Sequence, residues 1–342
     1  MSIVVVVGAG ASKEFNLPTG AELVDHISRF CKVKQNDFGD LNITNQILSR
    51  SCSILSAEAG TRALREQYIR AADHISKNMP LAPSIDNFLH TRRADPEVTK
   101  VGKLAIAATI LDAERMSLLH VPEGNVRNRP NFDAVKKTWI ASLFRVLITG
   151  RDFDGFLDAL REIVFVSFNY DRCIYQYLVY AAISYFDVQE KRVRELFDAI
   201  EVIYPYGSLG PLEWLGANLV GFGSSYNERE LLDISRGLNT FTEGSGTDRT
   251  IKISQAINNC RILIFLGFSF LDLNMELIGR KTGTAIDRVI ATGNGLSEES
   301  RHTIRQELAQ SFAMGVESSV ELKDRTCFEL FFDHHRYLER AF

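Results

Sequence analysis

The sequence predicts an α/β fold with a Rossmann-like, mostly parallel sheet, helices on both of its faces and a helical insertion. Two observations support this prediction. Short continuous runs of Val, Ile, Leu and Phe are typical of strands covered on both faces. Stretches with apolar residues at helical spacing separate these runs, and such alternation of strands and helices is typical of a parallel sheet.

The predicted strands are short apolar runs with little polar alternation, at residues 3–7, 163–168, 202–205, 262–266 and 289–291. Helices are predicted at residues 21–30, 249–258 and 298–312, where apolar residues recur at helical spacing. The apolar C-terminal stretch, 326–342, is expected to pack on the core as a last strand or helix. The alternative for this stretch is a surface that binds a partner.

The segment from about 41 to 154 has a different pattern, because no strand is predicted in it. Helical stretches cover 62–76, 101–119 and 131–148, with proline-containing breaks between them. We therefore predict one domain over 1–342, with a Rossmann-like core at 1–40 and 155–342 and a helical insertion at about 41–154. A separate helical domain is the alternative, but no obvious flexible linker leads out of the sheet.

Composition and charge exclude several classes of protein. Apolar residues make up 45% of the chain and charged residues 24%, which is ordinary globular composition. The net charge of −4 gives no electrostatic reason to expect direct nucleic-acid binding. The five cysteines form no CxxC pair, so neither a disulfide framework nor a zinc site is expected. No apolar run approaches the roughly 20 residues of a membrane helix, and we expect a cytoplasmic protein.

The first predicted strand runs directly into Gly8, Ala9, Gly10, Ala11 and Ser12. A glycine turn between a strand and a helix directs backbone N–H groups at a phosphate, and its glycines permit the tight turn and close approach of a ligand. Lys13 stands where the third glycine of a dinucleotide fingerprint belongs. No acidic residue ends a second strand about 20 residues later, so a plain nicotinamide dehydrogenase is not supported.

Three further strand ends carry small or polar residues. Asn169 and Asp171 follow the second predicted strand; Tyr206, Gly207 and Ser208 follow the third; Gly267 and Ser269 follow the fourth. Ligands of open α/β sheets bind beyond the carboxyl ends of the strands, and an asparagine there can hold a ribose hydroxyl or a water. Asp171 is equally well explained as a turn or helix cap. Together these ends predict a binding site at one sheet edge.

Taken in order, the stretches GAGAS followed by LPTG, FNYD, YGS and LGFSFLD resemble those of sirtuin-like domains. They are most similar to the bacterial branch of antiphage defence, which cleaves NAD to nicotinamide and ADP-ribose. The stretch SIDNFL, at 84–89, is also similar to that branch. The resemblance extends from residue 3 to about residue 272. It implies NAD as the substrate, and it implies no metal.

The resemblance also implies roles for individual residues. The glycine turn at 8–12 would contact the phosphates. Asn169 would be the catalytic asparagine, positioning the nicotinamide ribose or an attacking water, and Asp171 would support its turn. Asp86 would face the site, although an N-cap of the following helix explains it equally well. The adenosine side would be contacted by Gly207, Ser208, Gly267 and Ser269.

Two departures from the family pattern bear on the chemistry. The family has a general-base histidine before Gly-Ser, and this chain has Tyr206 there. Tyrosine, with an ordinary pKa near 10, is a poor base at neutral pH, but a cationic nicotinamide needs little help to leave. His90 is the alternative base, although a structural or surface role explains a lone histidine more simply. The missing CxxC pairs argue against a lysine deacetylase.

The expected function is therefore NAD hydrolysis, acting in antiviral defence by NAD depletion. The predicted sheet and insertion use nearly all 342 residues, so control is expected from self-assembly or from a partner. The resemblance implies a homo-oligomer and a HerA-type hexameric ATPase as partner. The main alternative is a weak or inactive module that binds NAD or ADP-ribose and scaffolds a complex. A nucleotide-dependent transferase is a third option.

Overall fold

The computed structural model describes residues 2–37, 39–122, 124–125, 128–212, 220–244, 248–279, 286–312 and 320–342. The chain forms two compact units. Unit 1 comprises Met1–Leu17, Ser117–Pro205 and Gly246–Phe342, and unit 2 comprises Pro18–Met116 and Tyr206–Ser245. These boundaries differ from those of the predicted insertion, because residues 117–154 belong to unit 1 and residues 206–245 to unit 2.

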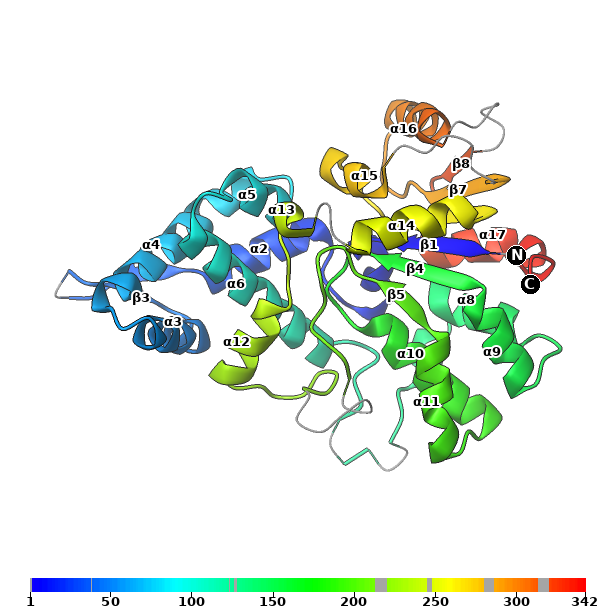
Figure 1. Ribbon diagram of the computed structural model, residues 1–342, viewed down its shortest axis with the longest axis horizontal. Helices are drawn as coiled ribbons and strands as arrows, with labels where there is room; N and C mark the ends of the chain where they lie inside the picture. The colour runs from blue at the N-terminus through cyan, green and yellow to red at the C-terminus, as the bar shows by residue number, and fades with distance from the viewer. Residues whose placement is uncertain are drawn as a thin grey trace. The chain divides into compact units, whose positions relative to one another are not determined.

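Unit 1 is built on a six-stranded sheet in the order β5-β4-β1-β6-β7-β8, and every neighbouring pair is parallel (Figure 1). Its strands are β1 (Ile3–Val7), β4 (Ile163–Ser167), β5 (Glu201–Ile203), β6 (Ile262–Leu266), β7 (Arg288–Thr292) and β8 (Val320–Lys323). Counted along the chain, this is the 3-2-1-4-5-6 order of a Rossmann fold, whose direction reverses between β1 and β6. The predicted fold class is confirmed.

The strands agree closely with the apolar runs in the sequence. β1 and β6 have the predicted bounds, and every residue of both is buried, as expected for strands covered on two faces. β4 and β5 end earlier than predicted, and β7 is one residue longer at each end. β8 was not predicted. It is a short edge strand in which buried and half-buried residues alternate, so it has no continuous apolar run.

Helices flank the sheet, with α14 in front of it in Figure 1 and α8 and α17 behind it. Trp139 of α8 lies 6.4 Å from Phe165 of β4 and 6.2 Å from Phe331 of α17, measured between ring centroids. The C-terminal stretch is therefore a helix on the core, which is one of its two predicted forms. The helices of unit 1 are α1 (Ala9–Ser12), η1 (Lys13–Phe15), α7 (Phe132–Val135), α8 (Trp139–Ile148), α9 (Phe153–Arg161), α10 (Cys173–Phe186), α11 (Glu190–Ala199), α14 (Asp248–Asn259), α15 (Asp272–Ile278), α16 (Glu298–Ser311) and α17 (Cys327–Glu339).

Unit 2 is mainly helical. Its helices are α2 (Gly20–Phe30), α3 (Gln46–Glu58), α4 (Arg62–Asn78), η2 (Met79–Leu81), α5 (Ile85–Thr91), α6 (Pro96–Arg115), α12 (Glu228–Arg236) and α13 (Phe241–Gly244). It also contains an antiparallel hairpin of β2 (Val33–Gln35) and β3 (Leu41–Ile43). The prediction that the segment from 41 has no strand is wrong at β3, because a three-residue, largely exposed strand leaves no apolar run. No described helix is both long and apolar enough to cross a membrane.

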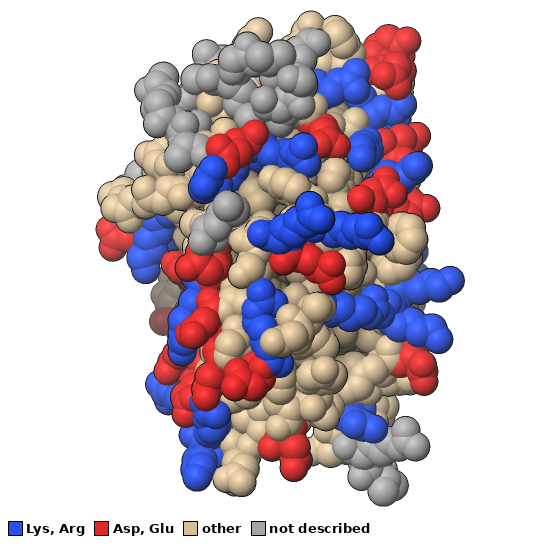
Figure 2. All heavy atoms as spheres, turned by 90° about the vertical axis from the view of Figure 1, so that its right-hand side faces the viewer, with Lys and Arg blue, Asp and Glu red and all other residues tan. Residues whose placement is uncertain are grey.

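Acidic and basic side chains are interspersed on the face shown in Figure 2. Several of the exposed cations of unit 1 are paired. Arg161 contacts Asp158 of α9 at 2.7 Å, and Arg192 contacts Glu195 of α11 at 2.8 Å. Such exposed pairs contribute little to stability.

Candidate functional site

The carboxyl ends of β1 and β6 meet through glycines. The N–H of Gly8 donates to the carbonyl of Leu266 at 2.9 Å, and the N–H of Gly10 donates to the carbonyl of Gly267 at 3.0 Å. A Cβ on Gly267 would lie 2.1 Å from the Ala11 nitrogen, and one on Gly8 would lie 2.5 Å from the Gly267 oxygen. These glycines therefore permit contact between two backbones, at the point where strand order reverses. The contact explains them without a ligand.

The turn after β6 is strained and presents one hydroxyl outward. Gly267 has φ +54°, and Phe270 has φ +55°, which is unusual for a bulky residue. The Phe270 ring packs on Phe265 and Phe268, with centroids 5.5 and 5.2 Å away, and this packing holds the strained backbone. Ser269, between Phe268 and Phe270 in the sequence, is exposed. Its predicted contact with a ligand stays a prediction.

Asn169 lies just beyond β4 and ties this strand to the glycine turn. Its side chain is only 7% exposed. The Nδ2 group donates to the Gly8 carbonyl at 3.0 Å and to the Ser12 hydroxyl at 2.8 Å. Ser12, at the end of α1, is buried as well. The first and second strand ends of the predicted site are thus joined by hydrogen bonds.

The neighbouring carboxylate determines how this network is oriented. The Ser12 hydroxyl donates to Asp171 Oδ2 at 2.7 Å, and Asp171 Oδ1 accepts the N–H of Cys173 at 3.1 Å. Because a carboxylate only accepts, the Ser12 hydrogen is directed to Asp171 and its oxygen accepts from Asn169. The Asn169 amide thus donates to the Ser12 hydroxyl, which in turn donates to the Asp171 carboxylate. Asp171 thus connects the first turn of α10 to α1.

This order leaves the amide oxygen of Asn169 available. Both amide hydrogens are directed to Gly8 and Ser12, and no described residue donates to Oδ1. The side chain therefore presents a fixed hydrogen-bond acceptor at the carboxyl edge of the sheet, where ligands of this fold bind. An acceptor in this position can receive a hydrogen bond from a ribose hydroxyl or from a water, and it can stabilise a nearby positive charge.

Two residues that the sequence analysis did not single out also hold this edge. The Gly267 N–H donates to the Thr292 hydroxyl, at the end of β7, at 2.7 Å. Glu14, directly after the glycine turn, accepts the N–H of Trp139 at 2.6 Å and that of Phe328 at 2.7 Å. Thr292 directly follows the predicted strand at 289–291, so the rule that found Asn169 also applies to it. Glu14 has no such signal, because its partners come from distant helices.

We predict that Glu14 makes stability depend on pH. Burial raises the pKa of Glu14 from 4.5 to about 7, against the opposing effect of its two backbone donors. A raised carboxyl pKa stabilises the fold below pH 4.5, and this stabilisation is lost as the pH rises through 7. Relative to wild type, the free energy of unfolding of Glu14→Gln should therefore rise by about 2 kcal/mol between pH 5 and pH 8.

Urea unfolding of both proteins at the two pH values measures this difference. Glu307→Gln, on the solvent side of α16, is the matched control and should show no such change, since that carboxyl is exposed. The prediction would be contradicted if Glu14→Gln and wild type differed in unfolding free energy by the same amount at pH 5 and at pH 8.

The third predicted strand end belongs to unit 2. The Tyr206 side chain is only 1% exposed, and its carbonyl accepts the N–H of Asn239 at 2.8 Å. Gly207 has φ +76°, and a Cβ on it would lie 2.2 Å from the Gly237 oxygen. The Ser208 hydroxyl accepts the N–H of Gly210 at 3.3 Å. Backbone packing within unit 2 accounts for Gly207, and Tyr206 is enclosed.

The predicted residues of SIDNFL also belong to unit 2. Ser84 is the N-cap of α5, accepting the N–H of Asn87 at 3.1 Å, and Asp86 lies in the first turn. The N-cap interpretation of Asp86 is therefore wrong, because the serine before the helix takes that position. The His90 ring meets the Phe241 ring edge-on at 5.0 Å. Unit 2 thus brings His90 close to the segment after Asn239, which bonds to Tyr206.

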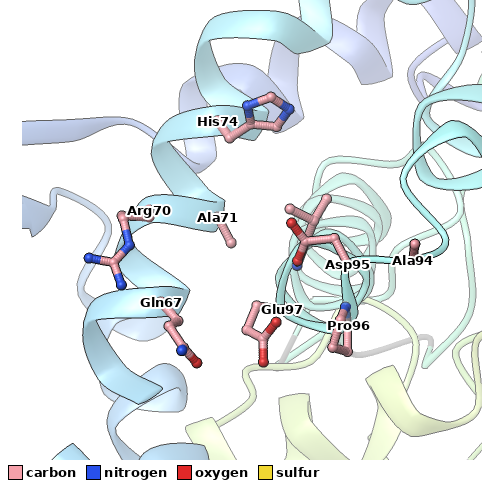
Figure 3. Close-up of a pocket in the computed structure, with 9 residues that line it drawn as sticks. Gln67, Arg70, Ala71, His74, Ala94, Asp95, Pro96 and Glu97 are labelled. Atoms are coloured by element: carbon pink, nitrogen blue, oxygen red, sulfur yellow. The ribbon is translucent and has the colours of Figure 1, made fainter. Parts of the chain in front are cut away.

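Unit 2 also contains a cavity of about 470 Å³ between α4 and the start of α6 (Figure 3). Figure 3 shows His74 at its upper end, with Asp95 and Glu97 on the opposite wall. His74 Nε2 has no hydrogen-bond partner among the described residues, and this atom is fully enclosed rather than open to the cavity. Asp95 accepts the Val98 N–H as the N-cap of α6. None of the predicted site residues lines this cavity.

The described residues contain no cluster of three or more His, Cys, Asp or Glu side chains that could hold a metal ion. The residues that converge at the sheet edge of unit 1 are Gly8, Gly10, Ser12, Asn169, Asp171 and Gly267. A scan against protein-family models finds no match for this chain, and a search of curated proteins finds none either.

Proposed function

We propose that unit 1 binds NAD at the carboxyl edge of its sheet and hydrolyses the bond between nicotinamide and ribose. The observation that carries the proposal is the fixed, unpartnered amide oxygen of Asn169 beside the β1 turn. The Rossmann strand order supports it, because this edge is where such sheets bind dinucleotides. The resemblance of GAGAS, FNYD, YGS and LGFSFLD to the motifs of sirtuin-like domains is the reason for proposing NAD as the ligand and hydrolysis as the reaction.

In the proposed reaction, the C–N bond breaks and its electron pair neutralises the nicotinamide ring. Water adds to the ribose carbon and releases one proton, so the products are nicotinamide, ADP-ribose and a proton. The amide oxygen of Asn169 would accept a hydrogen bond from the attacking water or from a ribose hydroxyl. Held by Gly8 and Ser12, it needs no reorganisation when positive charge develops on the sugar.

A specific observation favours the second candidate, a module that binds NAD or ADP-ribose without cleaving it. Tyr206, at the position where the resemblance implies a general base, is buried. Tyrosine, with an ordinary pKa near 10, is in general a poor proton acceptor at neutral pH. The hydrolase proposal therefore depends on the cationic leaving group and on Asn169 rather than on a base.

Incubating the purified chain with NAD, and separating the products by chromatography, distinguishes these candidates. Free nicotinamide with free ADP-ribose supports the hydrolase. Binding of NAD without release of nicotinamide supports the binding module, and transfer of labelled ADP-ribose to protein supports a transferase. Failure to bind or cleave NAD, both alone and with a partner, would overturn the proposal.

We further propose that assembly controls this activity, in keeping with antiviral defence by NAD depletion. The expected result is an oligomer in gel filtration, whose nicotinamide release rises when a HerA-type ATPase from a neighbouring gene is co-expressed. The measurement is turnover per chain, with and without that partner. A monomer with full activity alone would contradict this prediction.

A further inference from the structure

A second cavity lies in unit 1, with a volume of about 680 Å³. It is lined by residues of α7, α8 and α10, and by Asn125 and residues 129–131 before α7. Its volume is typical of small-molecule sites. None of the residues of the Asn169 network lines it, so it is distinct from the sheet-edge site.

Aromatic rings form much of the cavity wall. Tyr177 of α10 meets Phe132 edge-on at 6.1 Å and Phe144 edge-on at 6.2 Å. Tyr185, also on α10, meets Phe144 at 6.0 Å, yet it is 59% exposed. A large exposed ring beside a cavity with buried aromatic walls offers a stacking surface to a planar ligand.

The hydroxyl of Tyr177 is the most specific feature of this cavity. The residue is only 6% exposed, yet its hydroxyl forms no hydrogen bond with the described residues. Buried tyrosine hydroxyls usually find a partner, because an unsatisfied polar group costs free energy. The Tyr177 oxygen is not fully enclosed. Because Tyr177 lines the cavity, the accessible surface of this oxygen faces the cavity. It is available to a ligand there.

The charges around the cavity are mainly positive. Arg129, Lys136 and Arg145 line it, against the single carboxylate of Asp133. The Asp133 carboxylate forms an ion pair with Lys136, with Oδ1 3.6 Å from Nζ. The guanidinium of Arg145 donates to the Lys136 carbonyl at 2.5 Å. Neither Arg129 nor Arg145 has a carboxylate partner among the described residues. Two guanidinium groups thus remain for an anion, and guanidinium is well suited to phosphate.

We infer that this cavity binds a nucleoside phosphate, with the base against the aromatic wall, the phosphate between Arg129 and Arg145, and the Tyr177 hydroxyl bonded to the ligand. The inference goes beyond the proposed NAD site and does not depend on it. A nucleoside without phosphate shares part of this chemistry, as does phosphate alone. The probes of the experiment separate these ligands from a nucleoside phosphate.

Calorimetric titration of the full chain with AMP, adenosine and inorganic phosphate tests the inference. Using the Asn169→Ala chain as well separates this cavity from the sheet edge. We expect AMP to bind saturably in both chains, with adenosine and phosphate each at least tenfold weaker. Loss of AMP binding in Asn169→Ala, or equal binding of adenosine and AMP, would overturn the inference, as would absence of saturable binding at millimolar AMP.

Two substitutions locate the binding. Tyr177→Phe keeps the ring packing and removes only the hydroxyl, and should weaken AMP binding about 3- to 10-fold. Arg129→Ala should weaken it by a similar factor, because its guanidinium would contact the phosphate. Lys137→Ala is the control, since Lys137 is also an exposed cation but does not line the cavity. Wild-type affinity in both Tyr177→Phe and Arg129→Ala would place the ligand elsewhere and overturn the inference.

Discussion

Replacing Asn169 by alanine is expected to reduce nicotinamide release from NAD by about 100- to 1,000-fold, the usual cost of losing one preorganised polar group at a reacting centre. The substitution removes an amide oxygen that accepts no hydrogen bond from the described residues. It also leaves the Gly8 carbonyl without its side-chain donor, and a loss of about 1–3 kcal/mol in unfolding free energy is expected.

Ser12→Ala separates the chemical role of Asn169 from its structural role. This substitution removes the acceptor of one amide hydrogen and the donor to Asp171, but it leaves the amide oxygen in place. We expect a similar loss of stability and a loss of activity of only about tenfold, through less accurate positioning. Steady-state turnover and urea unfolding are measured on both variants. Equal losses of activity in the two variants would mean that Asn169 acts only through the fold.

Replacing Gly267 by alanine is expected to cost roughly 3–5 kcal/mol of unfolding free energy, from overpacking and the left-handed backbone together. The new Cβ would lie 2.1 Å from the Ala11 nitrogen and 2.3 Å from the Gly10 carbonyl carbon, at φ +54°. Both contacts are with backbone, so no side-chain rotation relieves them. A loss of this size is a large part of the stability of an ordinary domain.

Gly295→Ala is the matched control for this prediction. Gly295 is also in unit 1 and has φ +78°, but nothing lies within 4 Å of the position of its Cβ. The left-handed backbone alone should cost about 1–2 kcal/mol. Urea unfolding of both variants isolates the steric part of the effect. Equal losses would show that the backbone of the glycine turn moves away from β6 at little cost.

The sheet was largely predictable because its central strands are covered on both faces. Burial on two sides demands continuous apolar runs, and these are visible in the sequence at β1 and β6. The short β8 and the β2–β3 hairpin are not buried on both faces, so they have no continuous apolar run and were not predicted. The division into units was also not visible, since Tyr206–Ser245 joins Pro18–Met116 across the intervening Ser117–Pro205 of unit 1.

The candidate site was only partly predictable, for a related reason. Strand ends identify which residues reach the sheet edge, and this rule found Asn169, Asp171 and Gly267. It does not show what a residue contacts there. Gly267 was expected to line a ligand, whereas the structure packs it against Gly10 and Ala11. Glu14 went unnoticed because its two partners are more than a hundred residues away.

The sequence by itself determined the fold class, the parallel sheet and the polar residues at its carboxyl edge. Each of these follows from hydrophobic patterns within short segments and from the alternation of strands and helices along the chain. Only the tertiary structure decided how these residues are used. It joins Asn169 to Ser12, leaving one amide oxygen without a partner, and it presses the glycines of two strand ends together. Such hydrogen bonds and close contacts depend on the distances between segments that are remote in the sequence. A local sequence pattern does not contain these distances.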